Sequence, residues 1–134
     1  KLYYEKVAAM PHTIGPDRMS KAGKKAVIEG VLDKRVFTDD TNTLELYRLS
    51  TDHNDGMLVA YLPKEKILIE GDAFTPLAAD APRPTAANPF AVNLDENITR
   101  LKLDVKQIAA LHGPRLATMA DLKAFIAVRP TSTN

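Results

Sequence analysis

Two histidines and one aspartate stand where predicted strands begin or end. His53 precedes the apolar run 57–62, Asp72 follows the run 66–71, and His112 ends a short strand expected within 105–113. Imidazole nitrogen and carboxylate oxygen suit Zn²⁺, and a carboxylate can bridge two ions as a single imidazole cannot. Three such ligands leave an open position for water, whose pKa a zinc ion lowers towards neutrality. His53, Asp72 and His112 are therefore the candidate metal ligands.

A predicted β-hairpin would bring two of these side chains together. "MLVAYL" (57–62), apolar throughout like a strand buried on both faces, and "KILIEG" (66–71) are joined by three residues, a connection that forces antiparallel pairing. The loop 51–56 and the segment Gly71-Asp72 should then lie side by side. If the strand before His112 runs parallel to the second hairpin strand, all three candidate ligands converge at one end of the sheet.

The other elements predict an α/β (α+β) domain with a largely antiparallel sheet. Strands are expected at 26–31, 34–39 and 43–50, and helices near 4–10, from Asn93 to about 102, and through about 119–128. The last two helices carry cap signals, which are Asn93 with Glu96 and Thr118 with Asp121.

Two segments are expected to lie outside these elements. Residues 73–92 contain four of the nine prolines and predict a long surface loop that shapes any pocket. Residues 130–134 predict a frayed tail.

Length and composition indicate one folded unit over residues 1–134. The net charge of +1 comes from interspersed charges, so neither nucleic acid nor an anionic membrane surface is an expected partner. Cysteine is absent, which excludes thiolate metal sites and cysteine nucleophiles. No apolar run approaches a membrane span. The amino end has no signal pattern and no initiator Met, so we expect a processed protein or a fragment.

Each polar motif also has an ordinary structural interpretation. A histidine at a strand end is commonly a hydrogen-bonded surface residue, and Gly-Asp is commonly a turn. His12, in a Pro/Gly loop, is interpreted as structural or exposed. Asp39-Asp40 and the pair Asp52 and Asp55 stand in turn contexts, and no serine has a G-x-S-x-G frame. No residue is assigned as a catalytic acid, base or nucleophile.

The spacing of the three candidate ligands resembles that of the metallo-β-lactamase-fold hydrolases, in the C-terminal half of that fold. The matching pieces are His53-x-x-Gly56 before a strand, the hairpin ending in Gly71-Asp72, and Leu111-His112-Gly113 after the next strand. They occur in the family's order, and the resemblance extends from about the strand at 26 to the helix at 119–128.

The resemblance implies half of an αββα sandwich, with helices on one face of the sheet, and a zinc cofactor of one or two ions in the complete fold. In that scheme His53 serves one metal, Asp72 bridges two and His112 serves the second. Such enzymes attack esters, thioesters, lactams or phosphoesters of small molecules with a metal-bound hydroxide. The family's first ligand motif, H-x-H-x-D-H, does not occur in this sequence. Metal binding by this chain is therefore expected to be weak or partial.

Two functions remain open once this resemblance is taken into account. The first is the C-terminal half of a zinc-dependent hydrolase, inactive without the N-terminal half that carries the missing motif. The alternative is a non-catalytic assembly or binding module. Half a sandwich exposes an apolar sheet face and edge, so the expected partner is the missing half or, as a homo-oligomer, a second copy of the chain.

Overall fold

The computed structural model describes residues 1–11, 14–82 and 84–127, and within them it separates two compact units. The first unit spans Lys1–Leu32 and the second begins at Asp33. This division differs from the single unit expected over residues 1–134. His12, the end of the last predicted helix at Val128 and the predicted tail 130–134 lie outside the described residues.

The first unit contains two helices. Helix α1 spans Leu2–Ala9, close to the prediction, and α2 spans Arg18–Lys21, where no helix was predicted. The Asp17 side chain accepts a hydrogen bond from Ser20 N (2.7 Å) and so caps α2. The strand predicted at 26–31 is wrong, since these residues pair with no strand in the described part of the chain. Their β-branched side chains favour a strand only where a neighbouring strand completes the ladder.

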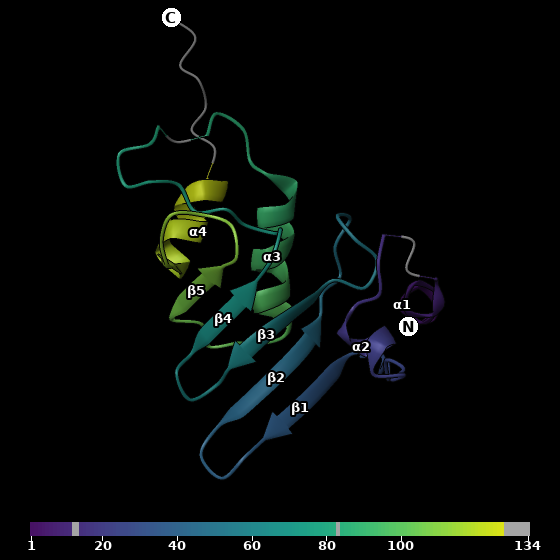
Figure 1. Ribbon diagram of the computed structural model, residues 1–134. Helices are drawn as coiled ribbons and strands as arrows, with labels where there is room; N and C mark the ends of the chain where they lie inside the picture. The colour runs from purple at the N-terminus through teal and green to yellow at the C-terminus, as the bar shows by residue number, and fades with distance from the viewer. Residues whose placement is uncertain (12–13, 83, 128–134) are drawn as a thin grey trace, which may run out of the picture. The chain divides into compact units, whose positions relative to one another are not determined.

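The second unit is a six-stranded sheet with two helices on one of its faces (Figure 1). The strands follow one another across the sheet in chain order. They are β1 (Lys34–Thr38), β2 (Thr43–Arg48), β3 (Leu58–Leu62), β4 (Ile67–Glu70), β5 (Gln107–Ala110) and β6 (Ala117–Thr118). The pairing is antiparallel except between β4 and β5, which run parallel. The predicted mixed fold with a largely antiparallel sheet is confirmed, whereas β6 was not predicted.

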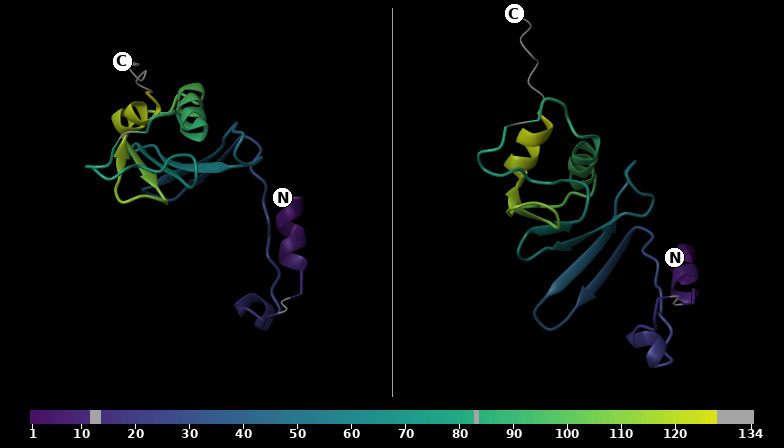
Figure 2. Two further views of the ribbon diagram at one scale, coloured as in Figure 1. Left: turned by 90° about the horizontal axis from the view of Figure 1, so that it is seen from above. Right: turned by 45° about the horizontal axis from the view of Figure 1, so that its top comes forward.

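Helices α3 (Pro89–Arg100) and α4 (Met119–Ile126) lie side by side against the sheet (Figure 2). The cap predicted at Thr118 is confirmed, because Thr118 and Asp121 form a complete capping box. The start predicted for the preceding helix is wrong. Asn88 is the N-cap, and Asn93 lies inside α3, where its side chain donates to Glu96 (3.2 Å). Pro89 at the first helical position favours this earlier start and shortens the predicted loop 73–92.

The core lies between the sheet and the two helices. On the sheet it is formed by alternate residues of the central strands, and on the helices by one apolar stripe, together including Tyr47, Val59, Tyr61, Leu68, Ile108, Leu94, Ile98 and Leu122. The hairpin strand 57–62 differs from its prediction, because Val59 and Tyr61 are buried but Leu58, Ala60 and Leu62 are not. One face of this strand is therefore open.

The open face of the sheet carries an apolar row across its central strands. The strand register puts Leu46, Ala60, Ile69 and Ala109 in one row across β2 to β5. None of the four is fully buried, and they lie on the side of the sheet opposite the core residues. A sheet with one face packed on helices and an apolar row on its other face has the layering of half a sandwich.

Candidate metal centre

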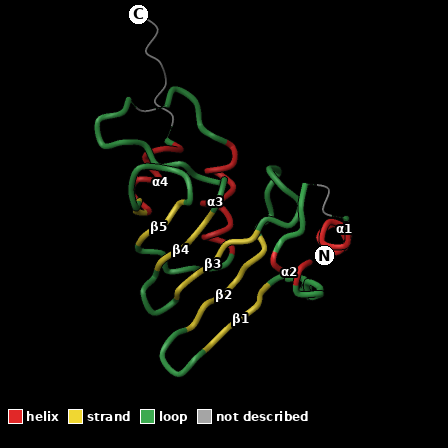
Figure 3. Tube along the Cα trace, viewed as in Figure 1, coloured by secondary structure: helices red, strands yellow, loops and turns green. Residues whose placement is uncertain are grey.

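Three loops reach the same end of the sheet (Figure 3). One precedes β3, another follows β4 and the third follows β5. Because β3 is antiparallel to β4 and β4 is parallel to β5, the start of β3 and the ends of β4 and β5 lie at the same end of the sheet. His53, Asp72 and His112 occupy these three loops. The expected parallel strand before His112 is therefore present.

The Asp72 carboxylate contacts both imidazoles. His112 Nε2 lies 3.0 Å from Oδ1 of Asp72, and His53 Nε2 lies 4.0 Å from Oδ2 of the same side chain. Each imidazole thus faces a different oxygen of one carboxylate. All three side chains reach solvent, with exposed fractions of 33% for His53, 58% for Asp72 and 65% for His112. The structure brings together the three residues that the sequence selected, while their role as ligands stays a prediction.

These donors fit a metal site in part. Two ligands of a tetrahedral zinc ion, each bonded at about 2.0–2.1 Å, lie roughly 3.3 Å apart. The distance from Asp72 to the His112 nitrogen, 3.0 Å, is slightly shorter than that spacing, and the distance to the His53 nitrogen, 4.0 Å, is longer. Over the described residues, however, no group of three or more His, Asp or Glu side chains is arranged to hold a metal ion. The described chain therefore offers pairs of ligands that share Asp72 and no complete site.

The His53 loop is held by α3. Asn97 of α3 accepts a hydrogen bond from Ser50 N (3.0 Å) and donates one to Ser50 O (2.7 Å). The His53 ring packs against Phe90 at the start of α3, with ring centroids 4.5 Å apart. Sequence analysis missed Asn97, although an amide within the apolar stripe of Leu94 and Ile98 was a visible signal.

Glu70 holds the turn that carries Asp72. Its Oε2 accepts hydrogen bonds from Ala73 N (2.8 Å) and Phe74 N (3.2 Å), while its Oε1 is buried without a partner among the described residues. Burial raises the pKa of this carboxyl, and the two backbone N–H groups oppose the rise. The sequence signal for Glu70 is a charged residue on the core side of the apolar strand 66–71.

Gly113 lets the loop after His112 approach the loop after Asp72. Its φ is +131°, and a Cβ built on it would lie 2.8 Å from Cδ and 2.9 Å from Cγ of Pro76. A side chain at this position would therefore be strained and would collide with Pro76. Glycine permits the close contact between the two loops.

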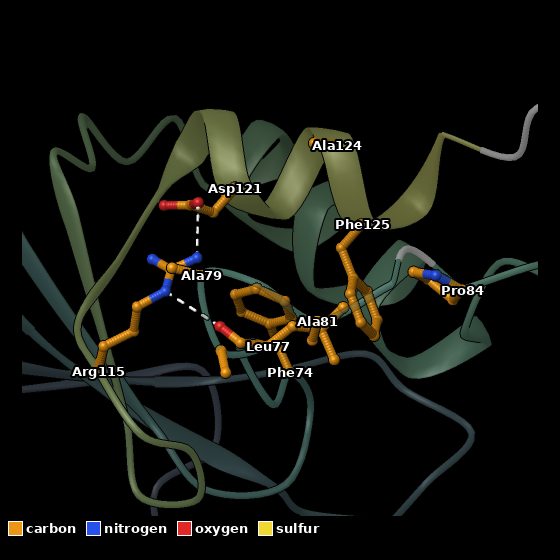
Figure 4. Close-up of a pocket in the computed structure, with 10 residues that line it drawn as sticks. Phe74, Leu77, Ala79, Ala81, Pro84, Arg115, Asp121, Ala124 and Phe125 are labelled. Atoms are coloured by element: carbon orange, nitrogen blue, oxygen red, sulfur yellow. Dashed lines mark hydrogen bonds and ion pairs between the residues drawn. The ribbon is translucent and has the colours of Figure 1, made fainter.

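A small pocket begins two residues after Asp72 (Figure 4). It has a volume of about 160 Å³ and is lined by the loop 74–84 and by α4, with Phe74, Leu77 and Phe125 supplying apolar surface. At its rim Arg115 donates to Asp121 Oδ1 (2.8 Å) and to Leu77 O (3.0 Å). Residues of the long segment after Asp72 thus line a pocket.

The other acidic motifs have structural roles. Asp39 Oδ1 accepts hydrogen bonds from Thr41 N (2.8 Å) and Asn42 N (2.7 Å), and these bonds lower the pKa of Asp39 to about 2. Asp55 pairs with Arg48 (2.7 Å). Asp39 thus stabilises the β1–β2 turn, as the turn interpretation of Asp39-Asp40 predicted.

Comparisons with solved structures identify the fold. A metallo-β-lactamase from Pontibacter korlensis aligns with a TM-score of 0.55 and 21% identity over 81% of this chain and 51% of its own. The metallo-β-lactamase TMB-1 aligns with a TM-score of 0.52 and 18% identity, over 81% and 50% of the two chains. DIM-1 metallo-β-lactamase aligns with a TM-score of 0.50 and 16% identity, over 86% and 54%.

The chain thus has part of the metallo-β-lactamase fold and spans about half the length of the solved structures that it matches. No protein-family model and no curated protein matches the sequence. No helix among the described residues is long and apolar enough to cross a membrane.

Proposed function

We propose that this chain is the C-terminal half of a zinc-dependent hydrolase, with His53, Asp72 and His112 as metal ligands. The observation that carries the proposal is the Asp72 carboxylate lying between two imidazoles at one end of the sheet. The shared fold with metallo-β-lactamases supports it. The substrate is a small molecule with an ester, thioester, lactam or phosphoester bond.

The three side chains would hold zinc through two neutral imidazole nitrogens and the two oxygens of Asp72. Because each imidazole faces a different carboxylate oxygen, Asp72 can serve two ions, one beside each histidine. When bound, zinc supplies Lewis-acid polarisation of the substrate and a water of lowered pKa. The exposure of the three side chains leaves room for further ligands from outside this chain.

Those further ligands would come from a complementary half that covers the open sheet face. The solved structures are about twice as long as the aligned part of this chain, so a segment of similar size has no counterpart here. The row of Leu46, Ala60, Ile69 and Ala109 offers that segment an apolar surface. The complementary half is therefore the proposed partner. A second copy of this chain is the alternative that would cover the same face of the sheet.

Zinc binding by the isolated chain tests the ligand assignment. If the folded chain binds zinc, its midpoint of thermal unfolding rises with zinc concentration, by the equivalent of about 2.7 kcal/mol at one hundred times the dissociation constant. The rise should disappear in Asp72→Asn and His112→Ala. His12→Ala is the matched control, because His12 is the histidine that the sequence does not select as a candidate ligand.

Complementation tests the activity. The segment encoded immediately upstream of residue 1, if it carries the H-x-H-x-D-H pattern, should form a one-to-one complex with this chain. That complex should hydrolyse at least one substrate class, and each half alone should hydrolyse none. A correctly folded complex without activity contradicts the hydrolase, and a homodimer that excludes the added half assigns the open face to a second copy.

The alternative is a non-catalytic assembly module, which the open apolar face favours. It predicts that zinc leaves the unfolding midpoint unchanged. A zinc-dependent rise that is lost in His112→Ala would remove this alternative.

A further inference from the structure

Two polar side chains are buried in the described part of the chain, and both are tied to the loops of the candidate metal centre. Glu70 is 2% exposed and Asn97 is 3% exposed. Buried polar groups are costly unless they are hydrogen-bonded, so their partners indicate what they hold in place. Here the bonds of the Glu70 side chain go to the turn after Asp72, and Asn97 bonds the loop before His53.

Glu70 connects the two loops that carry Asp72 and His112. Its carboxylate accepts the N–H groups of Ala73 and Phe74, which immediately follow Asp72. Its main-chain oxygen accepts the N–H of Leu111, the residue before His112, at 2.9 Å. One residue at the end of β4 thus fixes the backbone on both sides of the 3.0 Å contact between Asp72 and His112.

Core packing alone does not explain a carboxylate at this position. Leu68 lies on the same face of β4 and is fully buried as an apolar residue. Among the described residues the Oε1 atom of Glu70 has no hydrogen-bond partner, and its burial costs free energy that a leucine would avoid. The cost is consistent with a role at the turn rather than in the core.

Asn97 fixes the backbone of the third loop, which carries His53. Its amide accepts from Ser50 N and donates to Ser50 O, so the side chain pairs with both polar groups of one backbone residue. Two more bonds, from Arg100 Nη2 (2.7 Å) and to Asn93 O (2.7 Å), fix the amide on α3. Ser50 lies three residues before His53, so α3 sets where the His53 loop leaves the sheet.

We propose that Glu70 and Asn97 are positioning residues that hold the three loops of the metal centre in register before any metal binds. The proposal rests on the proposed function for the identity of the ligands, but the loop contacts can be tested without metal. Residues that orient metal ligands without touching the ion commonly lower metal affinity by about 10–100-fold when they are lost.

Amide hydrogen exchange on the 134-residue chain without metal tests the positioning itself. In Glu70→Leu, exchange at Ala73 and Phe74 should accelerate by roughly tenfold or more, because each loses its acceptor. Glu70→Gln retains a carbonyl oxygen at the same place and should preserve slow exchange. Asn97→Leu should accelerate exchange at Ser50 and leave Ala73 unaffected. Ile108→Val is the control, since Ile108 is buried on the same face of the sheet.

Zinc affinity is the second measurement, made by competition with a chromogenic chelator. Relative to the unmodified chain, Glu70→Leu and Asn97→Leu should weaken zinc binding by about 10–100-fold, whereas Glu70→Gln and Ile108→Val should bind nearly as well. If Glu70 and Asn97 only stabilised the fold, zinc binding would weaken in Ile108→Val as well. The loss of affinity in each variant would then follow the fall in its unfolding midpoint. Equal losses in all variants would therefore overturn the proposal.

The two proposals fail in different ways. If the unmodified chain binds no zinc, the ligand assignment fails, and amide exchange alone decides the positioning role. If zinc binds but Ala73, Phe74 and Ser50 exchange equally fast in every variant, the positioning role is wrong. If Glu70→Leu does not fold, the positioning role of Glu70 is tested in the unmodified chain. The measurement is the NMR scalar coupling across the hydrogen bond from Ala73 N–H to the Glu70 carboxyl. Absence of that coupling overturns the proposal.

Discussion

The close contact between Gly113 and Pro76 gives a quantitative prediction about the loop that carries His112. In Gly113→Ala, the new residue must adopt a φ of +131° and its Cβ must lie 2.8 Å from Pro76 Cδ. The backbone strain costs about 1–3 kcal/mol. Overpacking against the proline ring costs about 1–3 kcal/mol more. We therefore expect a loss of about 2–6 kcal/mol in the free energy of unfolding.

Two other glycines separate these contributions. Gly56 has a φ of +106°, and no described atom lies within 4 Å of the position that an added Cβ would take, so Gly56→Ala should incur the backbone strain alone. Gly71 has an ordinary φ and open space, so Gly71→Ala should be neutral or stabilising by about 0.4–1 kcal/mol. Chemical denaturation of the three variants measures these free energies directly.

A double variant checks the cause. Pro76→Ala removes both ring carbons that approach the new methyl group. When it is combined with Gly113→Ala, it should restore part of the stability that Gly113→Ala loses. When it is combined with Gly56→Ala, it should restore none of the lost stability. If Gly113→Ala and Gly56→Ala lose equal stability, and Pro76→Ala restores neither, the packing between these two loops is not as described. Gly113 would then not be required for the approach of the two loops.

Three further substitutions have smaller expected effects, each measurable from the unfolding midpoint. Lys102 follows α3 with a φ of +54°, so Lys102→Gly should relieve strain and stabilise by up to about 1 kcal/mol. The hydrogen bonds from Arg115 and Thr118 hold the pKa of Asp121 well below its usual value. The ionised Asp121 carboxylate therefore stabilises the fold fully above the usual carboxyl pKa, and this stabilisation is lost as the pH falls. Asp121→Asn should therefore cost about 1 kcal/mol at pH 7, and the difference should shrink below about pH 4; a constant difference would contradict this. Tyr61→Phe removes the bond from the Tyr61 hydroxyl to Asp104 O (2.8 Å) and should cost about 1 kcal/mol.

Local signals in the sequence were sufficient for much of the fold. The hairpin of β3 and β4 follows from two apolar runs and a short turn, and the capping box at Thr118 follows from residue spacing. Predictions from local signals were wrong in two places. In one, a predicted strand has no neighbouring strand, and in the other, two asparagines could each cap the same helix. Residues 26–31 have strand propensity but no neighbouring strand among the described residues, and Asn88 before Pro89 is a better cap than Asn93.

The identities of His53, Asp72 and His112 as candidate ligands came from the sequence alone, because each stands at a strand boundary that a short segment defines. Their distances to one another came only from the tertiary structure. Asp72 and His112 are far apart in the chain, and the parallel pairing of β4 with β5 brings them together. The contacts of Asn97 with Ser50 and of Gly113 with Pro76 were likewise beyond the sequence. Residue spacing encodes local geometry, whereas contacts between distant segments depend on how the whole sheet and its helices pack.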